Sequence, residues 1–142
     1  MRVNAINCNS LNFCKSQKFN RLDAKKQMRA TEKLVDKGIS ELYSDFDKYR
    51  GIPFDKTIYY SDVTFNVPDK KDTFATIAIQ PMEKAPAKQG QVVVEVQNDK
   101  SGEIVVSPVI SGGKDSIVSF LNDNENSIPN ITRTILGIAN KI

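Results

Sequence analysis

The residues best suited to chemistry form one short string, Ser111-Gly112-Gly113-Lys114-Asp115-Ser116. Two adjacent glycines let backbone N–H groups approach a phosphate closely, and the N-terminus of a following helix favours its negative charge. The string lies where this chemistry requires it, between a predicted strand at 103–110 and a predicted helix at 114–122. It is therefore the candidate phosphate-binding site of the chain.

The string resembles the SGGxDS phosphate-binding loop of the PP-loop ATP pyrophosphatases, which adenylate a substrate and release pyrophosphate. The resemblance implies that five residues cradle pyrophosphate: Ser111, Gly112, Gly113, Asp115 and Ser116. It also implies a parallel sheet with helical crossovers, whereas the 26 residues after Ser116 are fewer than one such unit needs. Pro108 moreover favours an edge strand. We therefore predict a Gly-Gly turn with Ser111 or Asp115 capping a helix, and keep nucleotide binding as an alternative.

Histidine is absent from the chain. Without it, neither a Ser-His-Asp nor a Cys-His catalytic group can be built from this chain alone. The two cysteines, Cys8 and Cys14, are too few for a structural zinc site, and we interpret them as incidental thiols rather than a redox pair. No acidic run matches a calcium-binding loop. We therefore predict a protein that is not an enzyme and that uses no cofactor and no metal.

Positive charge is concentrated near the N-terminus. Residues 1–34 carry eight Lys or Arg against two acidic residues, although the whole chain has a net charge of only +3. Four of the basic residues recur at every fourth position, which predicts a basic stripe on a helix: Arg21, Lys25, Arg29 and Lys33. Such a stripe can meet phosphates, so nucleic-acid binding through residues 15–37 is a second alternative. Because acidic neighbours interrupt the stripe and no aromatic residues are interleaved for base stacking, a solvated helix face is the favoured interpretation.

The stripe lies on the longest predicted element, an amphipathic helix over residues 21–49. Apolar residues recur along it at intervals of three, four or seven: Met28, Val35, Ile39, Leu42, Phe46 and Tyr49. Gly51 and Pro53 follow as stop signals. Residues 1–19 are polar and rich in Asn, which predicts a flexible arm before a single domain over residues 20–142.

Four segments alternate between apolar and polar residues, as half-buried antiparallel strands do: 57–67, 73–80, 91–98 and 103–110. The segments between them carry turn and loop signals, which is typical of a meander: 68–72, 81–90 and 98–102. The alternation also predicts the side chains that face the core: Tyr59, Val63, Phe65, Val67, Ala75, Ile77, Ile79, Val92, Val94, Val96, Ile104, Val106 and Ile110.

Two short helices are predicted after the strands, at 114–122 and 129–141, with a polar turn at 122–126 between them. The predicted fold class is therefore α+β. It is a single domain with a long N-terminal helix, a four-stranded antiparallel meander and two short C-terminal helices. We expect the first and last helices to cover one face of the sheet.

The opposite face of the sheet is predicted to be less polar than a solvated face. It carries apolar residues on each strand: Ile58, Tyr60, Phe74, Val93, Val105 and Val109. A second copy and the loop at 81–90 are the candidate covers for such a surface, and it favours a non-catalytic protein that acts through contacts with a protein partner or as a homodimer. Frequent Lys, Asn and Ile indicate a bacterial source. No segment has the pattern of a signal peptide or a membrane span, which predicts a cytoplasmic protein with no membrane partner.

Overall fold

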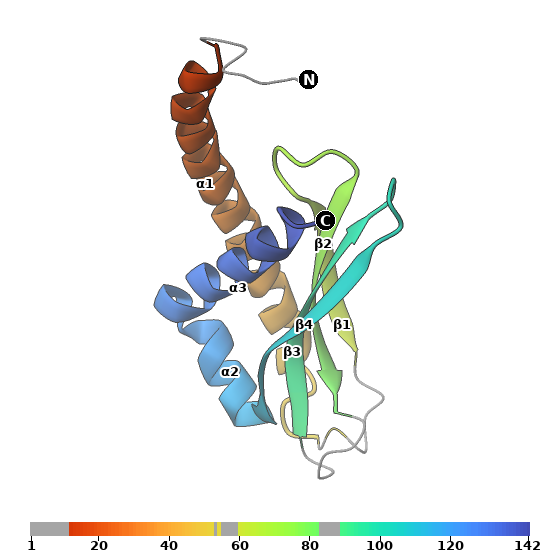
Figure 1. The fold of residues 1–142 in the computed structure, drawn as a ribbon. Helices are drawn as coiled ribbons and strands as arrows, with labels where there is room; N and C mark the ends of the chain where they lie inside the picture. Colours follow the sequence, from red (N-terminus) through yellow and green to blue (C-terminus); the bar gives the residue numbers. More distant parts are fainter. Residues whose placement is uncertain (1–11, 53, 55–59, 83–88) are drawn as a thin grey trace.

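The computed structural model describes residues 12–52, 54, 60–82 and 89–142, with the side chains of the first helix described from Asp23 onward. The elements follow in the order α1 (Asn12–Asp47), β1 (Ser61–Asn66), β2 (Thr73–Pro81), β3 (Gln89–Asn98), β4 (Ile104–Gly113), α2 (Lys114–Asn122) and α3 (Asn124–Ala139). Figure 1 shows the helices gathered on one side of the sheet. The predicted α+β class is confirmed.

The strands lie in the sheet in chain order, and every neighbouring pair is antiparallel. Val63 lies opposite Ile77, which in turn lies opposite Val94, so these side chains share the face that the helices cover. The predicted inward side chains of β2 and β3 are all buried there, as is Val67 after β1. Tyr59, also predicted to face inward, lies outside the described residues.

The C-terminal half of α1 supplies the centre of the core. Its buried residues are Val35, Ile39, Leu42 and Phe46, as the helical spacing predicts, whereas Tyr49 lies past the helix end and is exposed. Packing explains the glycine at position 38, because a Cβ built there would lie 2.9 Å from Cγ2 of Val63. The glycine that weakens the helix locally therefore allows α1 to approach β1 closely.

α1 begins at Asn12, well before the predicted start at residue 21. The segment 12–20 contains neither Gly nor Pro, so no local signal interrupts the helix. Residues 12–19 of the predicted arm are thus helical, while residues 1–11, with Cys8, lie outside the described residues. Figure 1 shows this end of α1 extending beyond the sheet, and residues 23–26 are all exposed.

The predicted inward face of β4 is partly wrong. Ile110 lies opposite buried Val92 and is half-buried, but Ile104 and Val106 are 55% and 54% exposed on the outer face. Val105, predicted to face outward, lies opposite buried Val96 and faces inward. A β-bulge is the cause, since the pairing shifts by one residue between Val92 and Val93. One extra residue in a strand moves every side chain on one side of it to the other face.

The C-terminal helices differ from the prediction mainly at their junction, although α3 also ends at Ala139 instead of residue 141. α2 has the predicted bounds, whereas α3 begins at Asn124 instead of residue 129. The predicted polar turn is reduced to Asp123, whose side chain accepts a hydrogen bond of 2.6 Å from the Asn126 amide. Asp123 also accepts backbone bonds from Asn126 and Ser127, which starts α3 before Pro129.

Candidate functional site

The candidate phosphate string is divided between two elements of regular structure. Ser111, Gly112 and Gly113 are the last residues of β4, and Lys114 is the first residue of α2. The predicted Gly-Gly turn is therefore wrong, because the strand passes directly into the helix. The predicted cap by Ser111 or Asp115 is also wrong, since Gly113 is the N-cap and no side chain caps the helix. The sheet around the string is antiparallel, unlike the parallel sheet that the resemblance implies.

The glycines at this end of the sheet allow close packing. Gly112 lies opposite Gly90, and a Cβ built on Gly90 would lie 2.5 Å from Cζ of Phe54. Gly112 has a φ of +156°, and a Cβ there would lie 3.2 Å from Cβ of Ser116. Glycine at these two positions lets the Phe54 ring and the first turn of α2 approach the sheet. The described contacts thus explain both glycines without a ligand.

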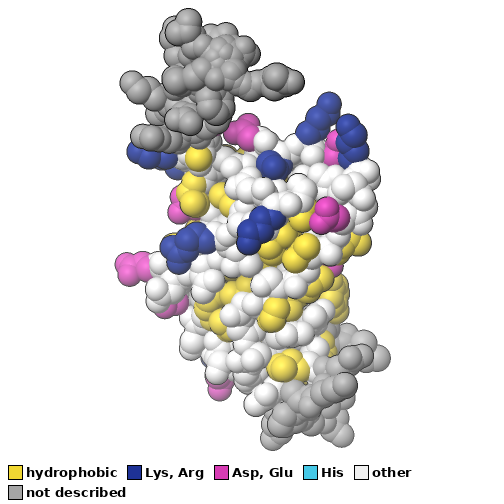
Figure 2. Space-filling view, viewed as in Figure 1, with side chains coloured by type: hydrophobic (Ala, Val, Ile, Leu, Met, Phe, Trp, Pro, Cys, Tyr) yellow, Lys and Arg dark blue, Asp and Glu magenta, His cyan; other side chains and the backbone are white. Residues whose placement is uncertain are grey.

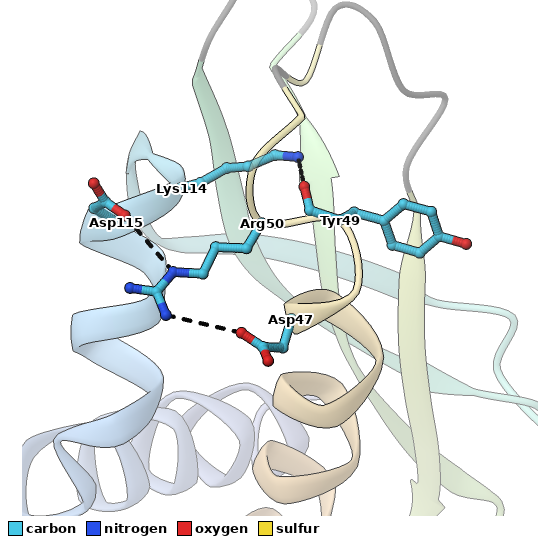
Figure 3. A network of polar contacts seen from close by, with 5 residues as sticks. All are labelled: Asp47, Tyr49, Arg50, Lys114 and Asp115. Carbon is cyan, nitrogen blue, oxygen red and sulfur yellow. Dashed lines mark hydrogen bonds and ion pairs between the residues drawn. The ribbon is translucent and has the colours of Figure 1, made fainter.

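Lys114 joins α2 to the end of α1 (Figure 3). Its Nζ donates a hydrogen bond to the Tyr49 carbonyl and lies 4.8 Å from the Phe54 ring centroid and 5.8 Å from that of Phe46. Only 8% of the residue is exposed, and desolvation by burial lowers the pKa of the amine. A cation beside the last carbonyls of α1 also interacts favourably with the negative end of the helix dipole.

Arg50 links the same two helices at the surface. Its guanidinium lies 3.9 Å from the Asp115 carboxylate and 3.8 Å from that of Asp47. All three side chains are largely exposed, so these ion pairs contribute at most about 1 kcal/mol each. We call the set Asp47, Tyr49, Arg50, Lys114 and Asp115 the Lys114 junction (Figure 3).

A surface hollow of about 350 Å³ lies beside the Lys114 junction, lined by Arg50, Ile52, Ser116 and their neighbours. Its two basic groups already contact this chain, since Lys114 binds the Tyr49 carbonyl and Arg50 faces two carboxylates. The described geometry is that of a structural joint between α1, β4 and α2. The pattern Gly-Gly-Lys before a helix carries no signal that distinguishes such a joint from a phosphate loop.

The basic stripe lies on the part of α1 nearest its N-terminus. Lys25, Arg29 and Lys33 are exposed, and the side chain of Arg21 lies outside the described residues. The carboxylates of Glu32 and Asp36 lie on the same surface. Together with Arg29, Lys33 and Ile128 of α3, they line a shallow hollow beside the stripe. The Lys and Arg side chains visible in Figure 2 form separate groups with uncharged atoms between them. Nucleic-acid binding by the stripe stays a prediction.

The outer face of the sheet lies opposite the helices, and we call it the open face. Its large apolar side chains among the described residues are Tyr60, Phe74, Val93, Ile104 and Val106. Val93 is buried by its neighbours and Phe74 is half-buried, whereas Tyr60, Ile104 and Val106 are each more than half exposed. Val109, also predicted for this face, is half-buried at the bulge, and Ile58 lies outside the described residues.

Tyr60 lies at the β1 side of the open face, near acidic groups. Burial, followed by the charge of Asp62, a hydrogen bond with Asp62 and the charge of Glu95, raises the pKa of the Tyr60 phenol. The phenol is therefore neutral at physiological pH. Ile104 and Val106 lie at the opposite side, on β4, where Glu95 is the cross-strand neighbour of Val106. Asp62 and Tyr60 thus lie at the β1 side of this face and Ile104 and Val106 at the β4 side, with Glu95 between them on β3.

Across the described parts of the chain, no helix is both long and apolar enough to cross a membrane. Nor do three potential metal-ligating side chains come together anywhere in those parts. Comparisons with models of known protein families, with curated proteins and with solved structures found no significant match.

Proposed function

We propose that this chain is a non-catalytic protein that binds another protein through the open face of its sheet. The observation that carries the proposal is the exposure of Ile104 and Val106, two large apolar side chains that point outward from the same strand. Exposed apolar side chains that gather on one face, with polar neighbours around them, are typical of interaction surfaces.

The contacts of the Lys114 junction support a structural interpretation of the Ser111–Ser116 string. Its most deeply buried basic group, Lys114, is held by a backbone carbonyl and two aromatic rings. The acidic side chain next in sequence faces Arg50. These residues serve the covered side of the molecule, whereas three of the five exposed large apolar side chains in the described residues, Tyr60, Ile104 and Val106, lie on the open face.

A photo-crosslinker on each side of the molecule tests the proposal. Benzoylphenylalanine at position 106 lies on the open face, and the same group at position 133 lies on the exposed side of α3 as a matched control. After irradiation in cells, we expect a protein adduct of higher mass from position 106 and none from position 133. No adduct from position 106, or equal adducts from both positions, would overturn the proposal.

A further inference from the structure

We infer that the protein that contacts Ile104 and Val106 at the β4 side of the open face is a second copy of this chain, joined edge to edge by antiparallel pairing of the two β4 strands. This inference rests on the proposed function and adds its partner and its geometry. In the pairing that we infer, Ile104 of each copy lies opposite Val106 of the second copy. The two sheets then form one continuous sheet, with the two-fold axis beside Val105.

Among the described residues, the backbone groups of β4 at these positions have no partner strand. Across the hairpin, the Asn98 N–H donates a bond of 2.9 Å to the Glu103 carbonyl, so these two residues face each other through their backbone groups. Antiparallel pairs alternate between facing and non-facing backbone groups. The next pair, Gln97 with Ile104, and the pair Glu95 with Val106 are therefore of the second kind. The N–H and carbonyl groups of Ile104 and Val106 point to the free edge of the sheet.

Pro108 agrees with this assignment. It lies opposite Val93 and two residues after Val106. Because backbone groups alternate in direction along a strand, its nitrogen also points away from β3. Proline in a sheet is found where no ladder bond is lost, on the open side of an edge strand. The edge therefore offers complete donor and acceptor pairs at Ile104 and Val106, and only an acceptor at Pro108. Pairing Ile104 with Val106 of the second copy uses the two complete positions in each strand.

The charges of the two sheet edges favour β4 as the self-pairing strand. β4 runs for 10 residues, Ile104–Gly113, without a charged side chain, so a second copy brings no like charges together. β1, the opposite edge, has 6 residues and carries the exposed Asp62. Two copies paired through β1 would bring these carboxylates near each other. Edge strands that avoid association commonly carry such a charge, a proline or a bulge; β4 carries no charge, and its Pro108 and bulge lie beyond the stretch at 104–106 that we infer to pair.

The apolar side chains complete the same geometry. Ile104 and Val106 both point to the open face, and both are more than half exposed in the single chain. In the inferred pairing, each Ile104 becomes the direct cross-strand neighbour of Val106 from the second copy. Four apolar side chains then form one cluster across the axis, and each covers part of the exposed area of another.

Analytical ultracentrifugation of the full chain over a concentration series tests the association. We expect the wild type to dimerise and Val106→Lys to weaken the dimer by about tenfold or more. The substitution brings the two Lys side chains of the dimer near each other across the axis, and it removes the apolar contact of Val106 with Ile104 of the second copy. Asn66→Lys is the matched control, because it adds the same charge to the exposed outer side of β1 and leaves the dimer unchanged. Circular dichroism melts verify that both variants fold.

Amide hydrogen exchange tests the pairing itself. We expect the amides of Ile104 and Val106 to be protected at high protein concentration and to exchange rapidly after dilution, while Val105 and Ser107 stay protected by β3 throughout. A chain that is monomeric at every concentration, or a dimer that is unaffected by Val106→Lys, would overturn the inference. If the chain is monomeric and position 106 still crosslinks to a different protein, the proposed function stands and the second copy is excluded. If neither occurs, both fail.

Discussion

The two faces of the sheet carry similar side chains in opposite surroundings. Ile77 on the helix-covered face is fully buried, whereas Val106 on the open face is 54% exposed. Both are β-branched apolar residues on strands of the same sheet. Burial of such a residue therefore depends on the layer packed over the strand and not on the strand pattern alone. The covered face holds the buried core, and the open face is the surface through which we propose association.

The largest expected effect comes from truncating the covered face. Ile77→Ala removes a fully buried side chain between β1 and β3, so we expect it to lower the free energy of unfolding by about 2–5 kcal/mol. Val106→Ala on the open face should lower it by less than about 1 kcal/mol in the monomer. Urea denaturation of both variants at low protein concentration measures the difference. Similar losses from the two variants would contradict the comparison.

The covered face is also sensitive to added volume. Gly90→Ala would place a Cβ 2.5 Å from the Phe54 ring, so we expect a loss of about 1–3 kcal/mol in the free energy of unfolding. Gly137→Ala is the matched control, since nothing lies within 4 Å of a Cβ there and the residue is exposed in α3. We expect the control to stabilise the protein by about 0.5–1 kcal/mol through helix propensity. Thermal melts of both proteins measure the contrast, and a neutral Gly90→Ala would disprove the tight packing.

The Lys114 junction should contribute a smaller and pH-dependent amount. Lys114→Met removes the hydrogen bond to the Tyr49 carbonyl, so we expect a loss of about 1 kcal/mol near neutral pH. Because the pKa of Lys114 is lowered in the folded state, the unfolded chain binds more protons just below the ordinary lysine pKa of 10.5. The contribution of Lys114 therefore makes stability rise with pH in that window.

Tyr60, which lies on the open face, gives stability a pH dependence opposite to that of Lys114. Its pKa is raised above 10.0, so its contribution to stability falls as pH rises through that value. Denaturation of the wild type, Lys114→Met and Tyr60→Phe between pH 8 and 10.5 separates the two groups. Lys114→Met should remove the rising contribution and Tyr60→Phe the falling one. Identical pH profiles for all three proteins would contradict both assignments.

The smallest expected effect concerns nucleotide. Because the basic groups of the Lys114 junction already contact this chain, we expect millimolar MgATP to leave the melting temperature unchanged. A ligand at 100 times its dissociation constant would add about 2.7 kcal/mol, which corresponds to a shift of several degrees. A shift that Gly113→Ala abolishes would instead assign phosphate binding to Ser111–Ser116.

Most of the fold followed from periodic patterns along the chain. The inward faces of β2 and β3 and the bounds of α2 were predicted correctly, because alternation and helical spacing report burial locally. The start of α1 was placed too late because an Asn-rich segment without Gly or Pro still forms a helix. The start of α3 was also placed too late, because the backbone N–H groups of Asn126 and Ser127 already donate to the Asp123 carbonyl, which starts the helix inside the predicted polar turn.

The candidate site could not be predicted in the same way. The orientation of β4 depends on the bulge opposite Val92 and Val93, which exists only once two strands are paired. Ser111–Ser116 has the residue types of a phosphate loop, and its role in the described structure depends on Phe46, Tyr49 and Phe54, which lie far away in the sequence. A local string does not show which distant groups its side chains will meet.

Composition and periodicity were therefore sufficient for the fold class, the order of the elements and most of the core. Each of these follows from interactions between residues that are close in the chain or from the average hydrophobicity of one face. Packing between distant segments placed Ile104 and Val106 outside, buried Lys114 between two aromatic rings and left β4 as an uncharged edge. Register and burial are properties of pairs of elements, so they arise only when those elements meet.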